Sequence, residues 1–138
     1  MAASGRALHH ISIGVSDLAR SAVFYDAVLA TLGMRRVWSD IRPGEQHQAI
    51  GYGFEDGKDL IAIKERGADA AHPGKGFHLA LGAPNIEAVY AFHAAAIASG
   101  GLSIAQAQLW PEFGPSYFAA YVTDPDGWQL EAVCNLAK

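Results

Sequence analysis

The first half of the chain begins with an alternating stretch that gives way to a helical one. Between Leu8 and Val15 apolar and polar residues alternate, which predicts a strand with two unlike faces. One face carries only small or polar residues, namely His10, Ser12 and Gly14, whereas the other is apolar. Ser16-Asp17 is a helix start, and apolar residues then recur at helical spacing until Gly33 ends the run. Three further strands are predicted at Met34 to Ile41, Gln46 to Phe54 and Leu60 to Lys64.

The same pattern starts again at Phe77. One offset of 68 residues, without gaps, aligns the histidines, helix starts and terminal glycines of the two halves: His10 with His78, Asp17 with Asn85, and Gly33 with Gly101. The second half is therefore predicted to contain a strand beginning at Phe77, a helix from Pro84-Asn85 to Gly100-Gly101, and strands at Leu102 to Leu109, Tyr117 to Val122 and Trp128 to Val133. Each half thus follows the order strand, helix, strand, strand, strand.

This repeat predicts the fold class. A unit of this kind leaves one side of its sheet uncovered, so two units are expected to pair and enclose a cavity. A chain of 138 residues has room for one domain with a shared core. We therefore predict a single α+β domain over residues 1–138, in which βαβββ modules at about 7–66 and 76–135 form a curved mixed sheet around a cavity.

A turn near the end of the chain brings a carboxylate into this picture. Asp124-Pro125-Asp126-Gly127 separates two apolar runs, and it predicts a tight hairpin: Pro presets φ, Asp126 can hydrogen-bond its own backbone, and Gly127 accepts a positive φ. In the strand that follows, alternation places Gln129, Glu131 and Val133 on one face. Glu131 therefore needs a polar partner on that face, since burying an unpaired carboxylate is costly.

Composition excludes several classes of function. Hydrophobic residues make up 51% and charged residues 17% of the chain, which indicates a globular protein. The net charge of −4 and the sequence pI near 5.8 give no reason to expect nucleic acid or an anionic membrane as a partner. With a single cysteine, Cys134, and no apolar stretch typical of a secretion signal or a membrane span, we expect a cytoplasmic protein.

Several of these segments together resemble a known family. Leu8-His9-His10-Ile11, Val15-Ser16-Asp17-Leu18, Phe24-Tyr25, Phe77-His78-Leu79-Ala80 and the Asp124-Pro125-Asp126-Gly127 turn ahead of Glu131 are similar to motifs of the vicinal oxygen chelate superfamily, which includes glyoxalase I, bleomycin-binding proteins and extradiol dioxygenases. The resemblance covers nearly the whole chain and implies the glyoxalase/bleomycin resistance/dioxygenase fold. Its motifs are much less specific for the reaction.

The resemblance also implies a metal site. It assigns His10, His78 and Glu131 as ligands of a divalent ion, and it places the fourth position of glyoxalase I-like sites at about Ala62, where no carboxylate stands. Glu65 fills that place only if the register slips. A site of two histidines and one carboxylate is therefore expected, and the ligand set is compatible with Zn, Mn, Fe, Ni or Co.

The expected chemistry follows from such a site. A bound ion stabilises negative charge on a substrate oxygen, and family precedent allows Glu131 to act as ligand and catalytic base. We expect a lyase or isomerase acting on a small oxygenated substrate, in a homodimer. Thiol transfer, dioxygenation and metal-free ligand binding remain as alternatives, the last with Glu131 in a buried ion pair with a histidine.

Further side chains are candidates for substrate binding. We assign this role to Lys64, Tyr52, Trp110 and Tyr121. Two further residues, Tyr25 and Tyr117, could either line the cavity or pack in the core. His9 is expected to point away from His10 and to be structural, because neighbouring residues of a strand face opposite sides.

Overall fold

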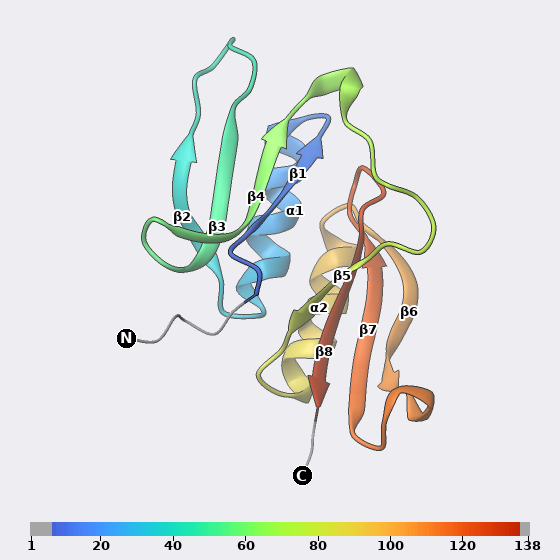
Figure 1. The fold of residues 1–138 in the computed structure, drawn as a ribbon. Coiled ribbons are helices and arrows are strands. Elements are labelled where there is room, and N and C mark those ends of the chain that lie inside the picture. The colour runs from blue at the N-terminus through green and yellow to red at the C-terminus, as the bar shows by residue number, and fades with distance from the viewer. Residues whose placement is uncertain (1–6, 136–138) are drawn as a thin grey trace.

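The computed structural model describes residues 7–135 and contains two units with the same order of elements (Figure 1). The first unit consists of β1 (Ile11–Val15), α1 (Leu18–Ala30), β2 (Arg35–Asp40), β3 (Ala49–Glu55) and β4 (Lys58–Glu65). The second consists of β5 (Leu79–Gly82), α2 (Ile86–Ala98), β6 (Leu102–Leu109), β7 (Tyr117–Thr123) and β8 (Gln129–Asn135). Single turns of 3₁₀ helix lie at Gly67–Asp69 and Pro111–Phe113.

Each unit forms its own four-stranded mixed sheet. The strand orders are β1-β4-β3-β2 and β5-β8-β7-β6. In each sheet the first strand pairs with the last in parallel, and the remaining pairs are antiparallel. The predicted α+β fold of paired βαβββ modules is confirmed, and Figure 1 shows the two sheets side by side with their helices behind them.

Both helices begin as the sequence predicts, but they end differently. The side chains of Asp17 and Asn85 accept hydrogen bonds from backbone N–H groups three residues later, at 3.0 and 2.8 Å. Gly33 follows α1 with a φ of +89°, which glycine adopts without strain. After α2 the residue with positive φ is Gly100, at +102°, and not the Gly101 that aligns with Gly33.

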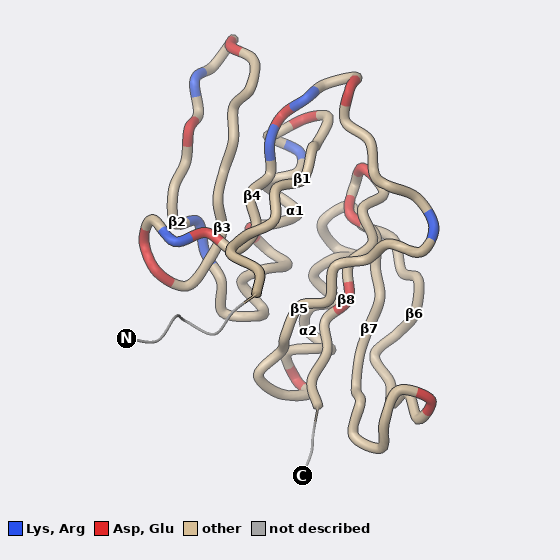
Figure 2. Tube along the Cα trace, viewed as in Figure 1, with Lys and Arg blue, Asp and Glu red and all other residues tan. Residues whose placement is uncertain are grey.

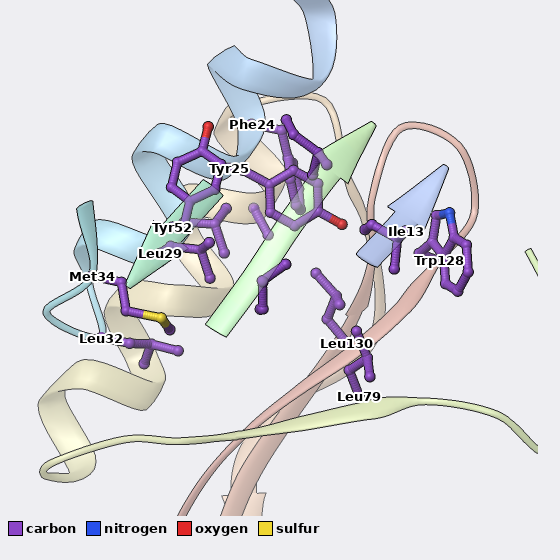
Figure 3. Close-up of a cluster of buried hydrophobic side chains, with 14 of the residues drawn as sticks. Ile13, Phe24, Tyr25, Leu29, Leu32, Met34, Tyr52, Leu79, Trp128 and Leu130 are labelled. Atoms are coloured by element: carbon purple, nitrogen blue, oxygen red, sulfur yellow. The ribbon is translucent and has the colours of Figure 1, made fainter. Parts of the chain in front are cut away.

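One hydrophobic core joins the two units. Phe24 and Tyr25 of α1 are fully buried, as are Val122 and Leu130 of the second sheet, and all belong to the same cluster. Figure 3 shows residues of α1 and the first sheet beside Leu79, Trp128 and Leu130. The helices α1 and α2 also contact each other. Because apolar area from both units is shared, neither sheet is packed independently of the other.

The predicted turn closes the β7–β8 hairpin, although its two aspartates have different hydrogen-bond partners from those predicted. Asp124, not Asp126, binds the turn backbone, since its Oδ1 accepts hydrogen bonds from the N–H groups of Asp126 and Trp128 at 2.9 and 2.8 Å. Asp126 instead reaches the first unit, where its carboxylate accepts hydrogen bonds from Ser16 and Arg20.

Two further hydrogen bonds hold the turn against the first unit. Tyr25 donates its hydroxyl proton to Asp124 at 2.7 Å, and the indole N–H of Trp128 donates to the Gly14 carbonyl at 2.9 Å. The turn therefore links the two units as well as closing its own hairpin.

Within residues 7–135, no helix has the length and apolar character required to cross a bilayer.

Candidate functional site

His78 and Glu131 lie together on the side of the second sheet that faces away from α2. Leu79, Leu130 and Ala132 point into the buried core on the helix side. Side chains alternate along a strand, so their neighbours His78 and Glu131 point to the opposite, open side. In the sheet, Glu131 pairs with Ala80 on one flank and with Tyr121 on the other. The alternation of β8 therefore places the carboxylate as the sequence predicts.

The two side chains form a close pair. Nε2 of His78 lies 2.9 Å from Oε1 of Glu131. The imidazole is 44% exposed, whereas the carboxylate is only 1% exposed. The second carboxylate oxygen, Oε2, accepts a hydrogen bond from the Tyr117 hydroxyl at 2.5 Å. Both oxygens of a buried carboxylate are thus bound, as burial requires.

Two phenols beside Glu131 are held in their protonated form. Burial, together with the hydrogen bond to Glu131 and its negative charge, raises the pKa of Tyr117 to about 12. Burial and the nearby charge of Glu131 also raise the pKa of Tyr121 above its ordinary value. At neutral pH the Tyr117 hydroxyl therefore remains a hydrogen-bond donor to the carboxylate.

A continuous set of aromatic rings borders the pair. We call Trp110, Phe113, Tyr117 and Tyr121 the aromatic wall. The ring of Tyr121 lies edge-on to His78 with centroids 5.8 Å apart, and edge-on to Trp110 at 5.2 Å. Phe113 stacks near Trp110 at 6.2 Å and contacts Tyr117 at 5.3 Å. The indole N–H of Trp110 donates to the Ala119 carbonyl at 3.0 Å, which fixes that ring to the sheet.

His10 lies apart from this pair in the single chain. It precedes β1, is exposed, and its Nδ1 lies 2.8 Å from Nδ1 of His9. The prediction that His9 points away from His10 is wrong, because the two rings contact each other, and both residues precede the first paired residue of β1, Ile11. Across residues 7–135, no three His, Cys, Asp or Glu side chains are grouped so that they could hold an ion.

A cavity nevertheless connects the segment of His10 with the second sheet. This cavity, of about 420 Å³, is lined on one side by His9 and His10 and on the other by residues of β5, including Ala80 and Gly82. Ala80 is the direct neighbour of Glu131 in the sheet. His10 and the strand beside Glu131 therefore open onto the same space.

The structure also locates the position where the first unit lacks a carboxylate. Ala62 pairs with Ser12 as Glu131 pairs with Ala80, and Ser12 and Ala80 are repeat equivalents. Ala62 is only 1% exposed. Beside it, Gly51 lies beneath Trp38, whose indole would overlap any side chain placed there.

Glu65 does not fill the empty position. Its carboxylate accepts hydrogen bonds from the backbone N–H of Leu18 at 3.0 Å and from the Gln48 side chain at 3.2 Å. Both contacts hold Glu65 near the beginning of α1, where negative charge is favourable.

The four predicted substrate-binding residues occupy different places. Trp110 and Tyr121 belong to the aromatic wall beside the pair. Lys64 pairs with Gly14 and Ala49 in the first sheet, on the side away from α1. The position of Tyr52 argues against a contact with substrate, because its ring is fully buried in the core and its hydroxyl donates to Asp26 at 2.7 Å. Tyr25 is likewise buried in the core.

Sequence reasoning missed two aromatic residues of the open faces. Phe113 sits in a loop without periodicity, and only its place beside Trp110 marks it. Trp38 lies in a strand whose register shifts between Arg36 and Trp38, so strict alternation does not predict which side of the sheet Trp38 faces. Only the small residues Gly51 and Ala62 on the neighbouring strands indicated that a bulky side chain, here Trp38, could cover this side of the sheet.

The observed pair is compatible with part of a metal site. Two ligand atoms about 2.1 Å from an ion in tetrahedral coordination lie about 3.4 Å apart. The His78–Glu131 separation of 2.9 Å reaches that value after a small movement of the exposed imidazole. Tyr117 orients the carboxylate as an outer hydrogen-bond partner commonly does for a ligand. His78 and Glu131 therefore fit two ligands, and a third must come from outside the pair.

Comparison with known proteins agrees with this architecture. The model of the Glyoxalase/Bleomycin resistance protein/Dioxygenase superfamily matches residues 7–132. A lactoylglutathione lyase of Haemophilus influenzae is 34% identical over 91% of this chain and 90% of its own length, and a probable lactoylglutathione lyase of Synechocystis is 31% identical over 95% and 97%. The crystal structure of a glyoxalase/bleomycin resistance protein from Albidiferax ferrireducens T118 superposes with a TM-score of 0.75 at 30% identity, covering 94% of this chain and 98% of that one. The chain belongs to the glyoxalase/bleomycin resistance protein/dioxygenase superfamily, also known as the vicinal oxygen chelate superfamily.

Proposed function

We propose that this protein is a metal-dependent lyase of the glyoxalase type, acting on a small oxygenated substrate at His10, His78 and Glu131. The observation that carries the proposal is the state of Glu131, a carboxylate that is 1% exposed with one oxygen at His78 and the other at Tyr117. A buried carboxylate held beside an accessible imidazole is typical of a functional site. The relatives named lactoylglutathione lyase make lactoylglutathione the first substrate to test.

The residues have distinct roles in this proposal. Nε2 of His78 and Oε1 of Glu131 would hold a divalent ion such as Zn, Mn, Fe, Ni or Co, with His10 as the third ligand. When bound, the ion supplies Lewis acidity that stabilises negative charge on a substrate oxygen. Tyr117 keeps the carboxylate in one orientation by donating to Oε2.

Glu131 is also the base of the proposed reaction. In a lactoyl thioester the hydroxyl-bearing carbon is next to the carbonyl carbon. Glu131 removes the proton from the former and returns it to the latter, while the hydroxyl proton passes to the carbonyl oxygen, so that the hydroxyl oxygen becomes a carbonyl and the carbonyl oxygen a hydroxyl. The carbon–sulfur bond then breaks as the new hydroxyl group transfers its proton to sulfur, which releases the thiol and an α-oxoaldehyde; the same steps in reverse form the thioester, which is the favoured direction. A positioned general base typically contributes 10²–10⁴-fold to such a rate.

A homodimer provides a route for His10 to complete the site. In one chain His10 is exposed and contacts His9 instead of the pair. The segment around His10 and the site of His78 both lie on open parts of their units. We therefore place His10 of a second copy at the His78–Glu131 pair, in a two-fold arrangement that forms the same site twice.

The turnover of lactoylglutathione tests the enzyme function. Wild-type protein loaded with Zn²⁺ or Ni²⁺ should form the thioester from glutathione and the α-oxoaldehyde, which is the favourable direction of this reversible reaction, and Glu131→Gln should lower kcat by at least about 100-fold, because an amide cannot accept the proton. The variant His93→Ala changes a histidine of α2 that bonds Ser103, and it should leave kcat unchanged. Equal rates for wild type and Glu131→Gln would contradict the proposed role of the base.

A metal-free binding function is the second candidate. The contact between His78 and Glu131 is made without a metal, at 2.9 Å, which favours this alternative. Such a protein would bind its ligand equally well in the presence of a strong chelator and would not catalyse the formation of lactoylglutathione.

A further inference from the structure

Positive charge is distributed very unevenly between the two units. Of the ten Lys and Arg residues in the chain, nine precede residue 77 and the tenth is Lys138. The segment 77–135 therefore contains no Lys or Arg, although it contains five acidic residues: Glu87, Glu112, Asp124, Asp126 and Glu131. Figure 2 shows the blue segments confined to the first unit and the connection to β5.

This distribution limits what the second sheet can bind at its open side. Away from the proposed ion, an anionic group on the open side of this sheet would meet no lysine or arginine from its own unit. A negatively charged substrate group would therefore have no cationic side chain of this unit to pair with. The part of a substrate that lies on this sheet is therefore expected to be uncharged.

The aromatic wall offers a surface for such an uncharged group. Phe113 is 58% exposed, although it is a large apolar side chain, and it lies on the 3₁₀ turn Pro111–Phe113 next to the site. Its ring is inclined by only 29° to that of Trp110, so the two rings already form a stacked pair. Tyr117 and Tyr121 continue the wall to Glu131 and His78. Planar groups stack favourably on such rings.

We propose that the substrate carries a flat, uncharged aryl or conjugated group next to its reacting oxygens, and that Phe113 determines the preference for this group. This inference rests on the proposed function for the location of the reacting oxygens. The flat group stacks on the exposed face of Phe113 while the oxygens lie at His78 and Glu131. Phe113 thus acts as a specificity residue and takes no part in proton transfer.

Two hydroxamic acids provide a direct test, because they differ only in the group concerned. Mandelohydroxamic acid carries a phenyl group and lactohydroxamic acid a methyl group, and both are largely uncharged at neutral pH with adjacent oxygens. Calorimetric titration of the Zn²⁺-loaded protein, repeated in the presence of a chelator, gives the ratio of the two Kd values. We expect wild type to prefer the phenyl compound by about tenfold or more.

Variants assign this preference to Phe113. Phe113→Ala should reduce the ratio to about twofold, and Phe113→Tyr, which keeps a flat ring, should retain it. Tyr90→Ala is the matched control, because Tyr90 is similarly exposed at 56% but lies on α2, behind the same sheet. The control should preserve the wild-type ratio, and thermal unfolding should verify that each variant is folded.

The outcomes separate this inference from the proposed function. A phenyl preference that depends on Phe113, in a protein that does not form lactoylglutathione from glutathione and the α-oxoaldehyde, would support the aromatic site and overturn the lyase proposal. Enzymatic formation of lactoylglutathione without any phenyl preference would support the lyase proposal and overturn the aromatic site. Equal binding of the two compounds, or a ratio unchanged in Phe113→Ala, would overturn the inference.

Discussion

Asp124 and Glu131 are buried carboxylates of one hairpin, yet their surroundings give them different tasks. Asp124 accepts hydrogen bonds from Tyr25, Asp126 and Trp128, all within the junction between the units. Glu131 is bound by Tyr117 and His78, and the latter is exposed. A carboxylate with buried partners on every side serves folding, whereas one with an accessible imidazole partner is available for chemistry.

The pH dependence of stability should reveal the burial of Asp124. Burial raises the pKa of Asp124 above its ordinary value, while the hydrogen bonds from Tyr25 and the turn backbone oppose the increase. The folded protein therefore binds this proton more tightly than the unfolded chain does. The resulting stabilisation is complete below the unfolded-state pKa of about 4 and is lost as the pH rises through the folded-state pKa.

Asp124→Asn removes this titration while keeping the side-chain shape. In urea unfolding from about pH 4 to about pH 8, the free energy of unfolding of wild type relative to Asp124→Asn should fall as the pH increases. A difference that rises with pH would show that the pKa of Asp124 is lowered in the folded protein.

The sequence predicted residue positions where strand alternation applies and missed those set by tertiary contacts. His78 and Glu131 share a face because both lie in or beside regular, paired strands. His10 likewise lies one residue before β1, but its ring contacts His9, and no local pattern indicates that contact. The hydrogen bond from Ser16 to Asp126 joins residues that are 110 positions apart, and no local pattern indicates such a contact.

At the scale of the elements, the internal repeat predicted the helices and strands of both units. The caps Asp17 and Asn85 follow from it, whereas the order of the strands within each sheet was not predicted. The two helix ends nevertheless differ. Gly33 adopts a left-handed backbone conformation, whereas Gly101 is required because its neighbours leave no room for a side chain. A Cβ atom at Gly101 would lie 2.5 Å from the Thr123 carbonyl oxygen and 2.7 Å from Phe24 Cε1. The tertiary neighbour, absent from the local sequence, decides the role of this glycine.

Gly101→Ala should therefore destabilise the protein. The clash with a backbone oxygen and a buried ring is expected to lower the free energy of unfolding by about 1–3 kcal/mol. Gly82→Ala is the control, since a Cβ there meets nothing within 4 Å, and it should change stability by less than about 0.5 kcal/mol. Chemical denaturation of both variants gives the comparison, and a neutral Gly101→Ala would contradict the close packing of the second helix end against the first unit.

At the scale of the whole molecule, pairing of the two units was predictable but their relative placement was not. Each unit needs a partner for its core, and the shared cluster around Phe24 and Leu130 meets that need. The placement is fixed by side-chain contacts such as Trp128 to Gly14 and Arg20 to Asp126, which periodicity does not indicate. With this placement the single chain joins His78 to Glu131 but leaves His10 apart.

A mixture of two defective chains tests whether a second copy supplies His10. His10→Ala and Glu131→Ala should each bind Zn²⁺ poorly, because each lacks one ligand in every site. If sites form between two copies, unfolding the variants together and refolding them at equal amounts should restore about a quarter of the wild-type sites, since half of the dimers are mixed and each contains one intact site. No restoration would place all ligands within one chain.

Calorimetric titration of the chelator-treated protein with Zn²⁺ tests the central claim most directly, which is that His78 and Glu131 hold a divalent ion. Wild type and the control His93→Ala are predicted to bind about one ion per chain, whereas His78→Ala and Glu131→Ala should bind at least about tenfold more weakly. A wild-type protein that takes up no ion, or a His78→Ala variant that binds as tightly as His93→Ala, would contradict the account.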